Sequence, residues 1–170
     1  MTKELFKSDE NVHIPHIFAS YSSDRLITME FIRNSIKINN KNDIEKVLNL
    51  NSIECANILI ETFAKMIFQF GHIHCDAHPG NILIRKHPKN PQKPQLVLLD
   101  HGIYRTLSPE VRIKFCELWK SLIEFDHDKV QELSKFFKIE EYSHYLPILF
   151  LFRTKHSRKL IGAQFTEVNA

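Results

Sequence analysis

Two short segments of the chain carry residue types and spacings that suit phosphoryl transfer. The first, His-Cys-Asp-Ala-His-Pro-Gly-Asn, contains Asp76 and ends at Asn81, and the second, Asp-His-Gly, begins at Asp100 after an apolar run. Phosphoryl transfer needs a carboxylate that orients the attacking oxygen and metal ions that neutralise phosphate charge. Asp76 can supply the orienting carboxylate. The amide oxygen of Asn81 and the carboxylate of Asp100 form the sparse oxygen ligation that suits Mg²⁺. We therefore expect Asp76 to be catalytic and the other two residues to be metal ligands.

The histidines around Asp76 leave more than one interpretation open. His78 is a second candidate catalytic residue, because its ring could contact the phosphate or the nucleophile, but it could equally order the loop. We expect His74 to hold the loop rather than to act as a base. Together with His72 and Asp76 these rings could suggest a transition-metal site, but their alternating spacing does not match a usual zinc pattern. A zinc site is therefore disfavoured.

A pair of predicted strands would bring the two metal ligands together. Residues 81–85 and 96–100 are predicted strands, and the connection between them, with three prolines and three lysines, is typical of a surface loop. A hairpin of this kind places Asp100 beside Asn81. Before the first segment, residues 51–70 are predicted to form a helix with Gly71 as its C-terminal cap. The apolar residues at helical spacing are Ile53, Ala56, Ile60, Phe63, Ile67 and Phe70.

The rest of the chain supplies short strands and several helices. Residues 12–20 and 25–32 are predicted strands around a turn at 22–24, and residues 33–43 are predicted to form a polar loop. Ser108 and Pro109 are suited to begin a helix, and a second helix should start near Asp126. A third should cover residues 140–152, with a bend or break at Pro147. This order predicts an α+β protein-kinase-like fold, mostly the helical large lobe with the last two strands of the small lobe.

Composition and charge exclude several other classes of protein. With 170 residues, of which 43% are hydrophobic and 25% charged, the chain has the composition of a globular protein with one domain. A net charge of +3 with scattered lysines gives no reason to expect a nucleic-acid partner. No apolar run reaches the roughly 18 residues that span a bilayer. The three cysteines share no C-x-x-C spacing, which suits a reducing compartment.

Taken together, the two segments resemble a known family. HCDAHPGNILI followed by LVLLDHGIYRTLSPEVR is similar to the aarF-domain (UbiB) family of atypical kinases, most of all to its mitochondrial branch with a His after the aspartate. The resemblance covers nearly the whole chain and implies a protein-kinase-like fold that binds ATP and Mg²⁺. It implies that Asp76 is catalytic and that Met29 is the gatekeeper. The main chain of Glu30 and Ile32 would hold the adenine edge.

The resemblance also implies a partner and a location. Family members take part in coenzyme Q metabolism or in mitochondrial membrane homeostasis, so we expect a lipid or membrane-associated partner besides the nucleotide. A mitochondrial location would follow. The first ten residues have neither an apolar signal core nor the character of a transit peptide, so the cytoplasm is the alternative location.

The residues before Met29 depart from the family pattern. Kinase-like enzymes place a nucleotide loop, a strand lysine and a helix glutamate ahead of the hinge, and none of these occurs in the first 28 residues. The K-x-G-Q segment of the family is absent as well. We expect residues 1–32 to be a remnant of the small lobe, with two strands and the hinge, and residues 33–165 to be the large lobe. The chain would be a fragment, a truncated gene product or a degenerate member, and whether it is an enzyme stays open.

The segment after the second motif bears on the phosphate acceptor. Only six residues separate Gly102 from Pro109, where typical protein kinases insert a long activation segment that docks peptides. A small-molecule or lipid-linked acceptor, or ATP hydrolysis, is therefore favoured. Two alternatives remain: a non-catalytic, pseudokinase-like interaction module, and a small-molecule kinase of the aminoglycoside or choline phosphotransferase type. The Leu-Ser-Pro-Glu continuation and His101 weigh against the second of these.

Overall fold

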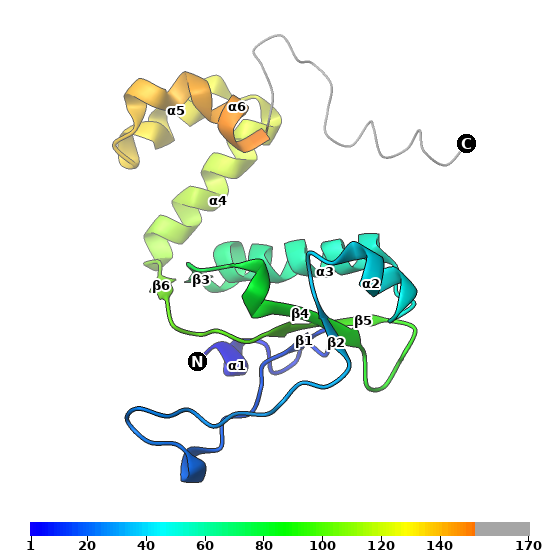
Figure 1. Cartoon of the computed structure of the whole chain (residues 1–170). Coiled ribbons are helices and arrows are strands. Elements are labelled where there is room, and N and C mark those ends of the chain that lie inside the picture. Colours follow the sequence, from blue (N-terminus) through cyan, green and yellow to red (C-terminus); the bar gives the residue numbers. More distant parts are fainter. Residues whose placement is uncertain (152–170) are drawn as a thin grey trace, which may run out of the picture. The chain divides into compact units, whose positions relative to one another are not determined.

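A computed structural model describes residues 1–151 and divides the chain into two compact units, Met1–Arg112 and a second that begins at Ile113 (Figure 1). The first unit has a small sheet and helices, and the second is helical. The predicted α+β class is therefore confirmed. Every candidate site residue named above lies in the first unit. The division of that unit into a small-lobe remnant over residues 1–32 and a large lobe beyond it stays a proposal.

Four strands form the main sheet of the first unit. In spatial order they are β1 (Val12–His13), β5 (Pro94–Leu98), β4 (Ile82–Lys86) and β2 (Ser35–Lys37). The central pair, β4 and β5, is antiparallel with Ile82 opposite Leu98, so the predicted hairpin is confirmed. β2 joins the free edge of β4 in antiparallel fashion, whereas β1 runs parallel to β5. β4 begins directly after the first motif, and β5 ends shortly before the second. The hairpin therefore positions the candidate metal ligands.

One face of the sheet is covered by α3 (Ser52–Ala64), which continues as a π-helical turn over Lys65–Phe70 (Figure 1). Asn51 caps the start of α3 by accepting hydrogen bonds from two main-chain N–H groups, and Gly71 ends the π turn with a φ of 61°. A left-handed residue at this position favours glycine, so the predicted cap is confirmed. The core between helix and sheet includes Ile84, Leu96 and Met66, each 1% exposed or less.

The outer face of α3 differs from the prediction. Ile53 and Ile60, expected on the buried face, are 68% and 65% exposed, whereas Cys55, Thr62 and Met66 are buried. The physical reason is that apolar residues extend beyond the buried face of this helix, so helical spacing alone cannot tell which of them meet the sheet.

The hairpin over residues 12–32 is only partly regular. Met29 pairs with Ile17 in an isolated antiparallel bridge, and the N–H of Glu30 donates to the carbonyl of His16 at 2.8 Å. Regular strand structure in this segment is limited to β1, so the two predicted strands are wrong in extent although their pairing is present. The predicted loop at 33–43 is also wrong, because it contains β2 and the first residues of α2 (Lys41–Lys46). The side chain of Asn40 caps the N-terminus of α2, and this cap stabilises a helix in a polar segment.

A second, two-stranded sheet was not predicted. It pairs β3 (His72–His74) with β6 (Tyr104–Thr106) in antiparallel register, His74 opposite Tyr104. It joins the residues just before the first motif to those just after the second. The first unit also contains α1 (Thr2–Leu5) at the N-terminal end.

The second unit consists of helices. They are α4 (Pro109–Glu124, beginning in the first unit), α5 (His127–Phe136), a 3₁₀ segment (Glu140–Tyr145) and α6 (Leu146–Leu151). Ser108 caps α4 through its hydroxyl, as predicted, and α5 starts after Asp126, as predicted, with the carboxylate of Asp126 as its cap. The third predicted helix is divided at Leu146, and Pro147 lies in the first turn of α6, where its missing N–H costs little. Its predicted last residue, 152, lies outside the described residues.

The core of the second unit is formed by Leu118, Leu122, Val130, Leu133 and Leu146. No helix within residues 1–151 combines the length and the apolar character that crossing a membrane requires.

Candidate functional site

Asn81 and Asp100 meet at the open end of the β4–β5 hairpin. The Nδ2 of Asn81 donates a hydrogen bond to Oδ2 of Asp100 at 3.2 Å, and both side chains are partly exposed. Asn81 lies one residue before β4, and Asp100 lies two residues after β5. The N–H of Leu99 donates to the carbonyl of Asn81 at 2.9 Å and so extends the hairpin toward both residues. The structure thus brings the two predicted metal ligands together.

The turn after Asp100 fixes its carboxylate further. The N–H of Gly102 donates to Oδ1 of Asp100 at 2.8 Å, so each carboxylate oxygen has one donor. A Cβ on Gly102 would lie 3.2 Å from that same oxygen, which is closer than an ordinary contact. Glycine at this position therefore lets the main chain approach the carboxylate.

His101, which follows Asp100, forms two hydrogen bonds through its ring. Its Nδ1 lies 2.8 Å from the hydroxyl oxygen of Tyr104, and its Nε2 lies 3.2 Å from the carbonyl oxygen of Leu98. Burial lowers the pKa of His101 and raises the pKa of Tyr104. Both shifts favour the uncharged forms that these hydrogen bonds need.

Asp76 lies in the exposed loop after β3. Its main-chain N–H donates to Nδ1 of His74 at 3.1 Å, and its carbonyl accepts from the N–H of His78 at 2.8 Å. His74 is only 4% exposed, and its hydrogen bond supports the loop, as the sequence predicts. The carboxylate itself is left exposed, where an acceptor molecule could reach it.

The observed contact of His78 is one that orders the loop. Its Nδ1 accepts a hydrogen bond from the N–H of Gly80 at 3.0 Å, and its carbonyl accepts from the N–H of Asn81 at 2.9 Å. A Cβ on Gly80 would lie 2.8 Å from the ring nitrogen, so any other residue at position 80 would displace the ring from this contact. A contact between His78 and phosphate stays a prediction.

The candidate hinge is held by the side chain of Glu30. Its Oε2 accepts hydrogen bonds from the main-chain N–H of His16 at 3.1 Å and from Nε2 of His13 at 2.9 Å. Burial raises the pKa of Glu30, but these two hydrogen bonds outweigh the burial and hold it below its usual range. The carboxylate therefore stays charged and anchors the segment that leads to Ile32.

Two main-chain groups of the hinge remain available. Within residues 1–151, neither the carbonyl of Glu30 nor the N–H of Ile32 forms a hydrogen bond. Ile32 is 7% exposed, whereas the side chain of Met29 is 41% exposed. Phe31, which lies between these two groups, is 83% exposed, so a ligand with a complementary donor and acceptor could reach them.

Leu83 belongs with the hinge, although the sequence analysis did not single it out. Phe31, Ile32 and Leu83 line one cavity of about 1030 Å³. Leu83 lies two residues after Asn81, on the strand face opposite the buried Ile82 and Ile84. The signal in the sequence is weak: three consecutive apolar residues in β4, of which the middle one has no core to enter.

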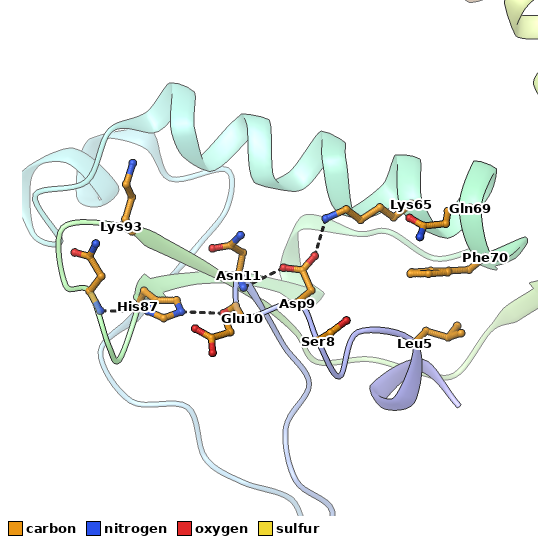
Figure 2. Close-up of a pocket in the computed structure, with 11 residues that line it drawn as sticks. Leu5, Ser8, Asp9, Glu10, Asn11, Lys65, Gln69, Phe70, His87 and Lys93 are labelled. Carbon is orange, nitrogen blue, oxygen red and sulfur yellow. Dashed lines mark hydrogen bonds and ion pairs between the residues drawn. The ribbon is translucent and has the colours of Figure 1, made fainter.

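A separate hollow of about 610 Å³ lies between residues 5–11, the end of the α3 region and the β4–β5 loop, and no candidate site residue lines it (Figure 2). Lys65 and Asp9 point toward one another across it, with Nζ 2.7 Å from Oδ2. The hydrogen bond to Asp9 raises the pKa of Lys65. This ion pair ties the N-terminal segment to the helix that supports the sheet.

Asp9→Asn should lower the free energy of unfolding by about 1 kcal/mol, because the partly buried ion pair loses its charge. The amide oxygen can still accept from the N–H of Asn11, so the loss isolates the contact with Lys65. Urea denaturation measures the change. Asp24→Asn is the control, since Asp24 is exposed, and it should leave stability unchanged. Equal stability of Asp9→Asn and the unmodified chain would contradict a stabilising role of the ion pair.

Comparison with known proteins identifies the family of the chain. Residues 1–134 match the ABC1 atypical kinase-like domain. The chain is 41% identical over 128 residues to "Probable serine/threonine-protein kinase abkD" of Dictyostelium discoideum, which covers 75% of this chain and 18% of that protein. It is 40% identical over 123 residues to "AarF domain-containing protein kinase 1" of Mus musculus, which covers 72% of this chain and 23% of that protein.

The chain therefore spans about a fifth of the length of these relatives. The matched region nevertheless includes both motifs and the hinge, and it extends over most of the described residues. The chain belongs to the ABC1 (aarF, UbiB) family of atypical kinase-like proteins.

Proposed function

We propose that these residues serve ATP- and Mg²⁺-dependent phosphoryl transfer or ATP hydrolysis. The observation that carries the proposal is the Asn81–Asp100 pair at 3.2 Å, with Gly102 fixing the second carboxylate oxygen. Membership of an atypical kinase-like family supports it. In this proposal Asp76 orients the acceptor, and His78 keeps the loop between Asp76 and Asn81 in shape.

The donor set of the hairpin end fits magnesium. Asn81 offers an amide oxygen and Asp100 a carboxylate, and oxygen ligands in small number suit Mg²⁺ when phosphate and water complete the shell. Among residues 1–151 there is no group of three or more His, Cys, Asp or Glu side chains that could hold a metal ion. The metal would neutralise phosphate charge, while the protein holds both ligands in place.

The adenine base fits the hinge. The free carbonyl of Glu30 can accept from an exocyclic amine, and the free N–H of Ile32 can donate to a ring nitrogen. Leu83 would contact the face of the base, because it lines the same cavity as Ile32. Met29 would flank the base as the gatekeeper that the family resemblance implies.

The acceptor in this proposal is a small or lipid-linked molecule. Only six residues lie between Gly102 and the first residue of α4, Pro109, and three of them form β6. So short a segment offers no long platform for a peptide. The family resemblance adds a membrane-associated partner, a link to coenzyme Q metabolism and a mitochondrial location to the proposal.

A second candidate function is a nucleotide-binding module without catalysis. The lysines of the first described residues favour it, because Lys3 lies in α1 and Lys7 follows it, and neither occupies a strand beside the candidate site. Lys7 pairs with Glu4 at 3.2 Å, and both side chains are 75% exposed. Phosphates that no lysine holds and no loop covers stay exposed to water.

The purified 170-residue polypeptide should bind Mg-ATP weakly and release no appreciable phosphate, because adenine contacts and metal ligands are present but the phosphate-holding lysine and loop are not. Calorimetry measures binding, and a phosphate-release assay measures turnover. Absence of ATP binding at millimolar concentration would contradict the proposed nucleotide site. Sustained turnover that disappears in Asp100→Ala would show that these residues contain complete catalytic machinery.

A further inference from the structure

We propose that Tyr104 is a positioning residue that couples the loop of Asp76 to the turn of Asp100. The inference deepens the proposed function, since it concerns how the same two carboxylates are held relative to one another. Tyr104 lies two residues after Gly102, outside the Asp-His-Gly motif itself.

The ring of Tyr104 contacts three imidazole rings. It lies parallel to the ring of His72, with centroids 4.4 Å apart and 8° between planes, and parallel to that of His101 at 5.8 Å and 9°. It is tilted by 42° against His74 at 5.0 Å. β6 places Tyr104 directly opposite His74 of β3, so the two-stranded sheet fixes the position of this ring.

One connection leads from Tyr104 to Asp100. The carbonyl of Leu98 can only accept, so the Nε2 of His101 carries the proton in the 3.2 Å hydrogen bond to it. In the neutral ring, Nδ1 is then an acceptor, and the Tyr104 hydroxyl donates to it at 2.8 Å. His101 is thereby held between the last residue of β5 and Tyr104. Since His101 lies between Asp100 and Gly102, the same contacts hold the turn in which Gly102 donates to the carboxylate.

A second connection leads from Tyr104 to Asp76. The Nδ1 of His74 accepts from the N–H of Asp76, whereas its buried Nε2 has no hydrogen-bond partner within residues 1–151. The orientation of His74 therefore depends on this one hydrogen bond and on packing against Tyr104 and Phe63, whose ring centroids lie 5.0 and 6.2 Å from that of His74. Removing the Tyr104 ring removes one of the two aromatic side chains that hold His74 under the loop.

The two connections use different parts of one side chain. The hydroxyl acts on the Asp100 turn, and the ring acts on the Asp76 loop. Reacting groups need placement within about half an ångström, so a shared support would keep the acceptor-orienting carboxylate and the metal ligand in register. Because the hydroxyl and the ring have different roles, two substitutions of Tyr104 can test the proposal.

The experiment is amide hydrogen exchange by NMR on the 170-residue chain. Tyr104→Phe keeps the ring and removes the hydroxyl, so exchange at Gly102 should become about tenfold faster while exchange at Asp76 stays unchanged. Tyr104→Leu removes the ring as well, so both amides should exchange about tenfold faster. Tyr21→Phe and Tyr21→Leu are the matched controls, because Tyr21 is 72% exposed, and they should change neither amide.

A merely structural role predicts a different pattern. In that case Tyr104→Leu would accelerate the amides of the central strand, such as Leu96, by the same factor as those of Asp76 and Gly102, and this result overturns the proposal. Unchanged exchange at Gly102 in Tyr104→Phe overturns it too, and it does so even if the leucine variant fails to fold.

Metal binding is measured separately, so that the positioning role and the proposed function can fail independently. With Mn²⁺ and ATP as probes, Tyr104→Phe should weaken Mn²⁺ binding about tenfold at an unchanged melting temperature, the usual scale for residues that support metal ligands. Equal Mn²⁺ affinity in this variant and the unmodified chain overturns the catalytic part of the inference. If the unmodified chain binds no Mn-ATP but the amides respond as expected, the coupling stands and the proposed function fails.

Discussion

Asp76→Ala should slow turnover by about 10²–10⁴-fold in a polypeptide that joins these residues to a complete small lobe. The structure gives the reason. The carboxylate is exposed at the end of a loop whose main chain is held by His74 and His78, so it is free to meet an acceptor. Loss of a group that orients or deprotonates the acceptor slows the chemical step on this scale. Steady-state kinetics with saturating Mg-ATP measures the change.

The affinity for nucleotide separates this role from a structural one. Asp76→Ala should leave Mg-ATP affinity nearly unchanged, because the carboxylate faces the acceptor and does not belong to the Asn81–Asp100 pair. Asp24→Ala, in the exposed turn of the hairpin, serves as the control and should keep full turnover. Near-normal turnover of Asp76→Ala would show that the role assigned to this residue is wrong.

The elements that position the site could be predicted where local signals were strong. Two short apolar runs joined by a proline-rich connection indicated the β4–β5 hairpin, and the hairpin alone was enough to place Asp100 beside Asn81. Helix ends were equally clear, because Ser108, Asp126 and Gly71 have cap geometry that few other residue types share.

Elements without local signals were missed. β3 and β6 have three residues each and pair across about 30 residues, so neither contains enough alternation to be noticed. Residues 33–43 were predicted to be a loop because they are rich in Asn and Lys, yet pairing with β4 and the Asn40 cap order them. The outer face of α3 could not be separated from the inner one because Ile53 and Met66 are equally apolar.

The residues of the site were likewise found where a local sequence motif marks them and missed where only the fold brings them together. Asp76, Asn81 and Asp100 were found because motif spacing marks them. Leu83 and Tyr104 were not, because in a sequence both look like ordinary packing residues. Their positions become informative only when the fold brings Leu83 to the hinge cavity and Tyr104 among three histidines.

Asp100→Asn should abolish Mg²⁺-dependent nucleotide binding, with affinity for Mg-ATP reduced about 100-fold or more in the same joined polypeptide. The pair at the hairpin end contains a single carboxylate, so the substitution replaces its only negative charge with a neutral amide. The amide oxygen can still accept from the N–H of Gly102, so the turn should be preserved. The loss would therefore report on metal ligation and not on folding.

Calorimetry with ATP in the presence and in the absence of Mg²⁺ measures this effect. Without Mg²⁺, the variant and the unmodified chain should bind ATP equally weakly, because the hinge contacts of Glu30 and Ile32 do not involve Asp100. With Mg²⁺, only the unmodified chain and the control Asp24→Asn should gain affinity. Equal Mg-ATP affinity in Asp100→Asn would mean that the metal is held elsewhere, and the Asn81–Asp100 pair would then be a structural contact that closes the β4–β5 hairpin.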